Sequence, residues 1–591
     1  MSQFSFQPRL LAILRREFAG YNTASFQRDL LAGITVGAVG LPLALAFGVA
    51  SGADAAAGLV TAILAGIIIG GLSGASFQIS GPTGAMSAVL IILAQRYGME
   101  GIWVASLLAG LFMLLLGLFR LGRYISFIPS PVIAGFTSGI ALIIAIGQLD
   151  NVLGVHTPAA ENSIGKLLGY FTHPVLPDVR ALALAGVVMV TMIVLPRFTK
   201  AIPGSLVGII LAALVAYFAG WNVPMIGAIP RTILLDHRLT LDAIPWSKLG
   251  DLVLPAVSIA ALGAIESLLC GSVGATMSGK PLDSNQELIA QGVGNLIIPF
   301  FGGVPATAAI ARTSVAIKSG AVTRLTSIIH AVGLLVSALA LASLIGQIPM
   351  AALGGVLLVT AWRMNEWESL HFFINTRLKH ALAGFAVTMI ATAALDLTQA
   401  ILIGITISAL IYLSQSASST AVTHEPVDAT KIQAQGFAIT ASCPSIHVYY
   451  LTGPLFFGSV TTVLEAFATA GDYYSLIVSM RGVPLVDAMG VQTIRQIVEE
   501  QHARKGEICF TALQPAVMDM FERTGLVELI GAQRFYWSSA NAIVDLHEQR
   551  MVNGCPHCDA SGGNCAVLRQ ARERLAREGE PKRTLAPGSA D

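Results

Sequence analysis

Long apolar runs follow one another from Leu30 to Leu413, separated by short polar stretches. About 20 apolar residues in a helix span the hydrocarbon of a bilayer, and several of these runs are shorter than that. We therefore expect a membrane domain over residues 28–415, after a cytosolic N-terminal segment, 1–27. Its segments, roughly 14 in number, cross the bilayer or enter it partway. They lie at about 29–50, 55–72, 80–95, 101–119, 127–148, 180–195, 203–220, 252–277, 286–302, 305–318, 325–345, 350–362, 379–395 and 399–415.

The pattern changes beyond Ser414, where charged residues and histidines return. From about Gly436, apolar runs such as SIHVYYLTG, SLIVSMRG and EICFTAL alternate with helical patterns near 460–470 and 490–504. Strands that alternate with helices predict an α/β domain. We place this domain at 436–548, after a linker at 416–435 and before a charged tail at 549–591 that contains cysteines.

The composition supports a membrane protein. The chain of 591 residues is 54% hydrophobic and 12% charged, against roughly 25% charged in soluble globular proteins. Its net charge of +1 lacks the basic excess with which proteins bind nucleic acids. The expected surroundings are therefore a lipid bilayer, and no nucleic acid is expected as a partner.

The basic residues indicate an orientation. Residues 1–26 carry arginines in an amphipathic pattern, without the apolar core and cleavage site of a signal peptide, so we expect a cytosolic N-terminus. The basic clusters of the loops then fall on the cytosolic side, in line with the positive-inside rule. Six cysteines without a disulfide framework fit a reducing compartment. We expect a multi-pass protein of a bacterial cytoplasmic (inner) membrane with both termini in the cytosol.

Two landmarks of the membrane domain are repeated. The stretch that opens with DLLAGITVG at Asp29 is similar to the one that opens with DLVLPAVSI at Asp251, 222 residues later. SGPTGAMSA, which contains Pro82, is echoed 223 residues later by GVPATAAIA, which contains Pro305. The matched spacing predicts two halves of about seven segments each, and an odd number of crossings makes the second half inverted in the membrane.

The short segments that follow Pro82 and Pro305 indicate a binding site. Proline is tolerated in the first turn of a helix, and small neighbours let a ligand approach the backbone. Two half-helices that start near the midplane from opposite sides aim unpaired N–H groups and positive dipole ends at one gap, which suits an anion. The alternative is that both prolines are ordinary kinks in full-length helices, because proline is common in membrane helices.

Glu266 is the only formal charge in GAIESLLCGSV and its apolar surroundings. An ionised carboxylate in hydrocarbon costs several kcal/mol, so we expect a function for it. The repeat maps Glu266 onto Leu43, directly after Pro42, and so places it near the midplane beside the half-helices. Burial favours the neutral form, and we expect Glu266 to take up and release a proton. The alternatives are a permanent pair with a base, Arg312 being the candidate, or hydrogen bonds to the backbone.

Other polar residues of the membrane domain carry weaker signals. Arg312 either assists anion binding or extends along its apolar stem to the cytosolic surface. Gln291 and Asn295 are typical of polar contacts that hold membrane helices together. The hydroxyl groups available to a ligand are those of Thr83, Ser87 and Thr307.

The motifs SGPTGAMSAV, GAIESLLC and SNQELIAQGVGNLIIPFFGGVPATAAIARTS, together with the C-terminal domain, resemble the SulP/SLC26 anion transporter family. GAIESLLC and PATAAIAR are most similar to its bacterial dicarboxylate- and sulfate-type members. The resemblance extends to about residue 548, and its most specific motif runs from Asn285 to Ser314. It implies an inverted seven-plus-seven helical fold in which a core domain, segments 1–4 and 8–11, moves against a gate domain, segments 5–7 and 12–14, in an elevator-like cycle. It also implies that the C-terminal domain is a STAS domain.

The same resemblance implies where the anion binds. Family members that use sodium to drive bicarbonate carry Asp and Thr where this chain has Glu266 and Cys270, which removes a hard oxygen ligand for sodium and favours a proton. Many relatives carry a glutamine where this chain has Leu43, and Phe47 nearby either walls the pocket or faces lipid or core. The site itself lies between the N-termini of segments 3 and 10, which here are Thr83, Gly84 and Ala85 facing Ala306, Thr307 and Ala308.

The C-terminal part carries two further signals. In regulatory relatives of the STAS domain a phosphorylatable serine follows an aspartate, whereas here Ala488 follows Asp487, so we expect a structural, dimer-organising or partner-binding role. The tail could bind zinc or an iron–sulfur cluster, but a single C-x2-C pair favours free thiols, and we expect no cofactor and no metal. The candidate ligands there are Cys555, His557, Cys558 and Cys565.

The sequence therefore predicts a secondary transporter that moves a small inorganic or carboxylate anion of the sulfate, bicarbonate or C4-dicarboxylate class together with a proton. We expect a homodimer, with a cytosolic partner of the STAS-like domain as a further option. A nucleobase transporter of the same fold would need more polar side chains in the pocket, and an anion sensor that signals through the STAS-like domain would bind without flux. An enzyme is not expected, because no nucleophile–base pair or metal cluster lies in the apolar segments.

Overall fold

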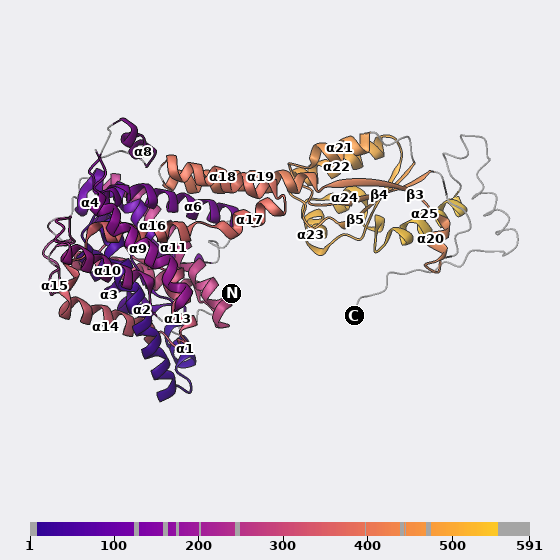
Figure 1. Cartoon of the computed structure of the whole chain (residues 1–591). Helices are drawn as coiled ribbons and strands as arrows, with labels where there is room; N and C mark the ends of the chain where they lie inside the picture. Colours follow the sequence, from indigo (N-terminus) through magenta and orange to yellow (C-terminus); the bar gives the residue numbers. More distant parts are fainter. Residues whose placement is uncertain are drawn as a thin grey trace. The chain divides into compact units, whose positions relative to one another are not determined.

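The computed structural model describes residues 9–122, 129–157, 163–172, 176–199, 202–227, 229–240, 242, 249–395, 397–437, 443, 445–468 and 474–553. The chain divides into two compact units, Met1–Ser408 and Ala409–Asp591. The first is a bundle of helices and the second contains a five-stranded sheet (Figure 1). The tail residues Cys555, His557, Cys558 and Cys565 lie outside the described residues.

Six spans in the described part of the first unit are long and apolar enough to cross a membrane: α2 (Thr23–Ala50), α3 (Ala55–Leu72), α4 (Gly84–Leu118), α6 with α7 (Ser130–Gly147 and Leu149–Leu153), α9 (Val179–Phe198) and α11 (Leu249–Ser278). Within α4, Gly98 has a φ of 70°, which divides the helix into the two segments expected from the sequence, because glycine adopts this backbone without a steric cost. The other elements are α1 (Arg9–Glu17), β1 (Ser80–Gly81), α8 (Ser163–Thr172), α10 (Gly204–Phe218), α12 (Ser284–Ile297), η3 (Ile298–Phe301), β2 (Thr307–Ala308), α13 (Ile310–Lys318), α14 (Leu325–Ala340), α15 (Ala342–Ile345), α16 (Met350–Met364), α17 (Trp367–Asn375), α18 (Lys379–Ala394) and α19 (Leu397–Ser418).

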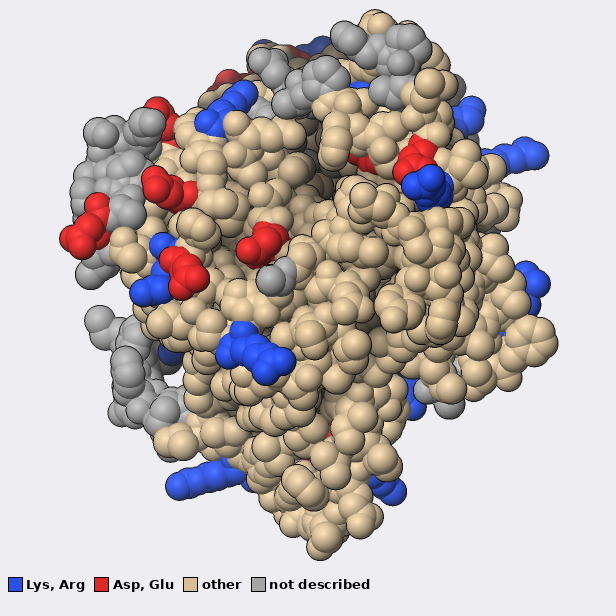
Figure 2. All heavy atoms as spheres, turned by 60° about the vertical axis from the view of Figure 1, so that its left-hand side comes forward, with Lys and Arg blue, Asp and Glu red and all other residues tan. Residues whose placement is uncertain are grey.

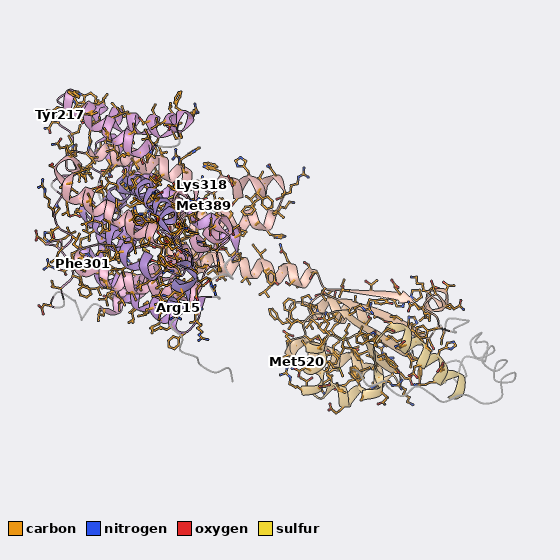
Figure 3. All side chains as sticks on the ribbon, turned by 90° about the horizontal axis from the view of Figure 1, so that it is seen from below. Arg15, Tyr217, Phe301, Lys318, Met389 and Met520 are labelled. Carbon is orange, nitrogen blue, oxygen red and sulfur yellow. The ribbon has the colours of Figure 1, made fainter. Side chains whose placement is uncertain are left out.

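The surface of this unit is suited to lipid. Large apolar side chains such as Leu31, Ile34 and Val190 are exposed on the outer faces of the helices. Most of the surface in Figure 2 carries neither acidic nor basic side chains. Arg15 and Lys318 lie toward one end of the bundle, whereas Tyr217 and Phe301 lie at the other (Figure 3). Arg15 and Lys318 thus share one end, as the positive-inside rule leads us to expect for these two residues.

The two repeated halves meet in a short antiparallel sheet, to which each half contributes one strand next to its repeated proline motif. Strands β1 and β2 pair with Ser80 opposite Ala308 and Gly81 opposite Thr307. Segments related by an inverted repeat run in opposite directions through the membrane, so an antiparallel pair is the expected way for them to meet. The pair lies just before Pro82 on one side and just after Pro305 on the other.

The second half-helix begins later than the sequence indicated. Helix α4 begins at Gly84, close to its proline, but α13 begins at Ile310 and not in the turn after Pro305. The intervening backbone stays extended because its polar groups are bound elsewhere: the N–H group of Ala306 donates to Asn295 Oδ1 at 2.7 Å, and the Asn295 amide donates back to the Ala306 carbonyl at 2.9 Å. An extended segment satisfied in this way has no need of helical hydrogen bonds.

Hydrogen bonds between described residues divide the helices of the first unit into two groups. The core group contains α2, α3, α4 and α11 to α14; for example, Asp29 of α2 accepts from the amide and hydroxyl groups of Thr323 before α14. The gate group contains α6 to α10 and α16 to α18; for example, Arg363 of α16 donates to the Met192 carbonyl of α9 at 2.7 Å. The described residues show no hydrogen bond between the groups, which meet where α4 packs against α6 and α16 against α2.

The second unit is an α/β domain with sheet order β3-β4-β5-β6-β7. Strand β3 is antiparallel to β4, and the remaining strands are parallel. One hydrophobic cluster lies on each face of the sheet, around Phe510 on one and around Ile477 on the other. Its elements are β3 (Ala421–Pro426), α20 (Ala429–Gln433), β4 (Ile446–Thr452), α21 (Val460–Ala468), β5 (Ser475–Gly482), α22 (Ala488–Ala503), β6 (Glu507–Thr511), α23 (Pro515–Arg523), α24 (Leu526–Ile530), η4 (Ala532–Arg534), β7 (Phe535–Tyr536) and α25 (Ser539–Asn553).

The region expected to be a linker, 416–435, contains two of these elements, β3 and α20. The residues of β3, AVTHEP, are mostly exposed and show no apolar alternation. Their strand conformation comes from pairing along the length of β4, in which Ala421 lies opposite Thr452. Because this pairing is a long-range contact, local periodicity does not predict it.

Candidate functional site

Helix α4 begins at the expected anion gap with a side-chain cap. Thr83 has an extended backbone, and its Oγ1 accepts a hydrogen bond from the Met86 amide at 3.3 Å. A threonine cap satisfies one of the amides that lack a partner in the first turn of a helix. The amides of Gly84 and Ala85 precede it at the same terminus, where the helix dipole favours a negative charge.

Helix α13 begins without such a cap, at Ala309. Of the residues expected to face the anion here, the Ala306 amide is bound to Asn295, and the Ala308 amide donates to Ser267 Oγ at 3.2 Å. The Thr307 hydroxyl lies 2.9 Å from the same Ser267 oxygen. The amides left at this helix terminus are therefore those of the first turn of α13, from Ile310 onward.

Apolar side chains close over the start of α4. A Cβ atom at Gly84 would lie 2.6 Å from Ile144 Cδ1, 3.1 Å from Met364 Sδ and 3.1 Å from Phe47 Cε1. Ile144 and Met364 belong to gate helices α6 and α16, whereas Phe47 belongs to core helix α2. The N-terminus of α4 thus lies at the boundary between the groups. Phe47, which is only 4% exposed, packs beside it as part of the hydrophobic core.

Glu266 is bound to the cap of this helix. Thr83 Oγ1 donates to Glu266 Oε2 at 3.0 Å, and the Glu266 residue is only part-buried. Among the residues that the structure describes, its carboxylate accepts no second hydrogen bond and forms no ion pair. The charge state of Glu266 is therefore coupled directly to Thr83, the residue that caps α4.

A second carboxylate, Glu287, is held quite differently. It is fully buried, and it accepts hydrogen bonds from Ser73 Oγ at 2.5 Å, the Gly74 amide at 3.0 Å and Gln291 Nε2 at 2.9 Å. Three donors stabilise an ionised carboxylate. Glu287 therefore joins α12 to the residues that follow α3 as a structural group, whereas Glu266 has one donor among the described residues.

Arg312 supplies positive charge behind the gap. Its side chain is 1% exposed, and Nη2 donates to the Pro82 carbonyl at 2.5 Å. It therefore neither extends to the cytosolic surface nor pairs with Glu266. The Nη1 atom has no hydrogen-bond partner in the described part of the chain, and a Cβ at Gly81 would lie 2.7 Å from it. A larger residue at position 81 would therefore displace the guanidinium from its present place.

Cys270 lies beside this site on α11. Its thiol is 3.3 Å from Thr313 Oγ1, which in turn accepts from the Ile79 amide at 3.1 Å. The Thr313 oxygen is thus already hydrogen-bonded to the backbone of Ile79, and residue 270 presents a sulfur atom instead of an oxygen beside the site. No group of three or more His, Cys, Asp or Glu side chains suited to a metal ion is present among the described residues.

Sequence reasoning did not single out three residues of this region. Ser267 binds the β2 backbone, and only its place next to Glu266 could have drawn attention to it. Glu287 lies within the motif from Asn285 to Ser314, but the motif gave no role to this residue on its own. His330 of α14 is fully buried against Gly40, and neither of its ring nitrogens has a partner among the described residues.

Comparison with known protein families matches most of the chain. The model of the sulfate permease family matches residues 26–391, and the STAS domain model matches residues 439–542. The chain is 33% identical over 536 residues to YvdB of Bacillus subtilis, a candidate sulfate transporter, covering 88% of this chain and 97% of that one. It is 28% identical over 538 residues to the bicarbonate transporter BicA of Picosynechococcus, covering 87% of this chain and 94% of that one.

Solved structures show the same fold. The transmembrane domain of a cyanobacterial BicA matches with a TM-score of 0.59 at 30% identity, covering 66% of this chain and 98% of that one. SLC26A9 matches with a TM-score of 0.80 at 16% identity, covering 96% of this chain and 97% of that one. These likenesses confirm the predicted fold class, an inverted helical membrane domain followed by a STAS domain.

Proposed function

Because the chain belongs to the sulfate permease family, whose members include sulfate and bicarbonate transporters, we propose that it carries a small anion of the sulfate, bicarbonate or C4-dicarboxylate class across the membrane together with a proton. The observation that carries the proposal is the hydrogen bond from Thr83 to Glu266, which joins a carboxylate that forms no direct ion pair with any described residue to the cap of α4. The anion binds between this helix terminus and the first turn of α13.

The proton and the anion bind in the same state for an electrostatic reason. An ionised Glu266 would place a negative charge one hydrogen bond away from the cap of α4, and this charge would repel an incoming anion. Protonation removes the repulsion and leaves the amides of Gly84 and Ala85 with the dipole of α4 to attract the anion. Release of the proton on the other side then favours release of the anion.

Backbone amides would favour anions over neutral molecules, but they would discriminate little between anions of different shape. The groups at the gap are helix N-termini, the Thr83 and Thr307 hydroxyls and the buried Arg312, with Phe47 as an apolar wall. Such groups recognise charge and size. Few side chains there could match the hydrogen-bonding edge of a nucleobase, which favours an inorganic or carboxylate anion as substrate.

The division of hydrogen bonds supports an elevator-like cycle. Within the described residues, polar contacts hold the core helices to one another and the gate helices to one another, but none crosses the boundary. A boundary made of apolar contacts, such as those of Ile144 and Met364 over Gly84, can slide without breaking buried hydrogen bonds. The core group would then carry the anion and Glu266 together past the gate group.

Transport by purified protein in liposomes tests the proposal. Uptake of labelled sulfate, bicarbonate and succinate is measured with an inward proton gradient, with no gradient and with a sodium gradient. We expect at least one anion to accumulate with the proton gradient and none to need sodium. Absence of uptake of all three under every gradient would overturn the proposal.

A further inference from the structure

The STAS domain contains a cleft that the transport cycle leaves without a role. Its volume is about 680 Å³, and it lies on the face of the sheet that carries α20 and α25. Thr452, Gly482 and Ala512 line it, and these residues lie at or just beyond the carboxyl ends of the parallel strands β4, β5 and β6. Clefts at the carboxyl ends of parallel strands are the usual ligand sites of α/β sheets, and this volume is in the range of ligand pockets.

The floor of the cleft is part of a row of hydroxyl side chains. In register across the sheet, Tyr450 lies opposite Ser479, Ser479 opposite Thr511, and Thr511 opposite Tyr536. Ser539 at the start of α25 shares hydrogen bonds with Tyr450 and, at 3.1 Å, with Thr511. The row is therefore tied to the N-terminus of the helix above it.

One member of the row, Ser479, has no hydrogen-bond partner among the described residues. Ser479 is only 5% exposed and lines the cleft, yet its hydroxyl makes no hydrogen bond to any described residue. Buried hydroxyl groups in folded proteins are nearly always hydrogen-bonded, to protein, water or ligand. An unpaired hydroxyl in the floor of an open cleft is therefore suited to contact a bound molecule.

The lining of the cleft carries both signs of charge, with Glu425 and Asp428 acidic and Arg481 and Lys431 basic. Arg481 follows Ser479 on the same face of β5 and forms no ion pair among the described residues, and Lys431 of α20 also lines the cleft. The N-terminus of α25, a helix of 15 residues, opens onto the same space through Ser539 and Ala540. A guanidinium group, a helix N-terminus and hydroxyl donors together match a phosphate.

We propose that this cleft binds a small phosphate ester, with its phosphate between Arg481, Ser479 and the start of α25. A phosphate alone fills only a small part of the volume, so the rest of the cleft holds the body of the ester. Glu425 and Gln435 also line the cleft, and their side-chain oxygens can accept hydrogen bonds from hydroxyl groups, which a sugar provides. The class of ligand is therefore a sugar phosphate, read by a cytosolic domain attached to a transporter.

Hydrogen exchange of the full-length protein in lipid nanodiscs, followed by mass spectrometry, tests the proposal. The probes are glucose 6-phosphate, inorganic phosphate, sulfate and glucose. Peptide resolution separates this cleft from the anion site of the membrane domain. We expect glucose 6-phosphate to slow exchange in peptides that cover residues 425–435, 479–482 and 538–543, and to do so at lower concentration than phosphate or sulfate, while glucose has no effect.

Two variants separate binding from general effects. Arg481→Ala should weaken the protection about tenfold or more, because it removes a charged hydrogen-bond donor. Arg504→Ala, an exposed arginine at the end of α22, should leave the protection unchanged. The proposal is overturned if glucose 6-phosphate gives no protection in these peptides, if phosphate or sulfate protects at the same concentration as the ester, or if Arg481→Ala protects like the wild type.

Discussion

Replacing Glu266 with glutamine isolates the proton from every other property of the site. Glutamine keeps the shape of the side chain and an oxygen that accepts the Thr83 hydrogen bond of 3.0 Å, but it cannot take up a proton. If one proton crosses with each anion, a gradient of one pH unit contributes about 1.4 kcal/mol, or a tenfold accumulation at zero membrane potential, to transport of a monoanion. The variant should lose this factor and only equilibrate the anion.

The assay is accumulation of the transported anion in liposomes at several pH gradients, with the membrane potential clamped by potassium and an ionophore. The wild-type slope should approach tenfold per pH unit, and the Glu266→Gln slope should be zero. Exchange of labelled for unlabelled anion at equal pH should persist in the variant, because the helix termini that bind the anion are unchanged.

Glu287→Gln is the matched control. Glu287 accepts three hydrogen bonds in a fully buried position, and glutamine replaces one acceptor oxygen with a donor. A mismatched buried pair costs about 1–3 kcal/mol, so this variant should unfold at lower temperature, while the protein that folds keeps its pH slope. A Glu266→Gln protein that still accumulates anion in proportion to the pH gradient would refute the reasoning, as would a Glu287→Gln protein that folds but has lost the slope.

Three further predictions concern the helix termini. Gly84→Ala places a methyl group 2.6 Å from Ile144 Cδ1 and should raise the KM for the anion. The control is Gly186→Ala on α9, where an added Cβ meets nothing within 4 Å, and it should transport like the wild type. Equal KM values for the two variants would argue against a site at Gly84. Thr83→Ala removes the cap of α4, so it should lower the folding stability by about 0.5–2 kcal/mol and weaken anion binding. Thr83→Ser keeps the hydroxyl group and should retain both the stability and the binding. Calorimetry measures the stability, and equilibrium binding measures the affinity for the anion. Asp487→Ala removes the cap of α22, in which Asp487 Oδ1 accepts a hydrogen bond of 2.8 Å from the Gly490 amide. It should lower the stability of the STAS domain by about 1 kcal/mol without changing transport. Reduced transport with an intact domain would contradict a purely structural role.

Local patterns carried much of the architecture. The membrane segments follow from apolar runs, which reflect transfer into hydrocarbon and need no knowledge of neighbours. The inverted repeat follows from the spacing of Pro82 and Pro305, and it places the two half-helices and Glu266 at one depth. The strands and helices of the STAS domain from β4 onward follow from the same local periodicity.

Other features came only from tertiary contacts. Strand β3 has no strand pattern of its own and exists through pairing with β4, and α13 begins at Ile310 because Asn295 holds the preceding backbone extended. A sequence shows which side chains are polar but not how many donors surround them. The unpaired hydroxyl of Ser479 in the STAS cleft is visible for the same reason only in the folded domain.

Glu266 and Glu287 show the division most clearly. The sequence by itself determined that Glu266 lies in an apolar segment, where an isolated charge is costly, and it did not single out Glu287. The tertiary structure decided that, among the described residues, Glu287 has three donors and Glu266 one, which is the residue that caps α4. The number of donors sets how strongly the ionised form is stabilised. Ser73 and Thr83 lie about 200 residues from the carboxylates to which they donate, so they reach them only when the two halves fold together.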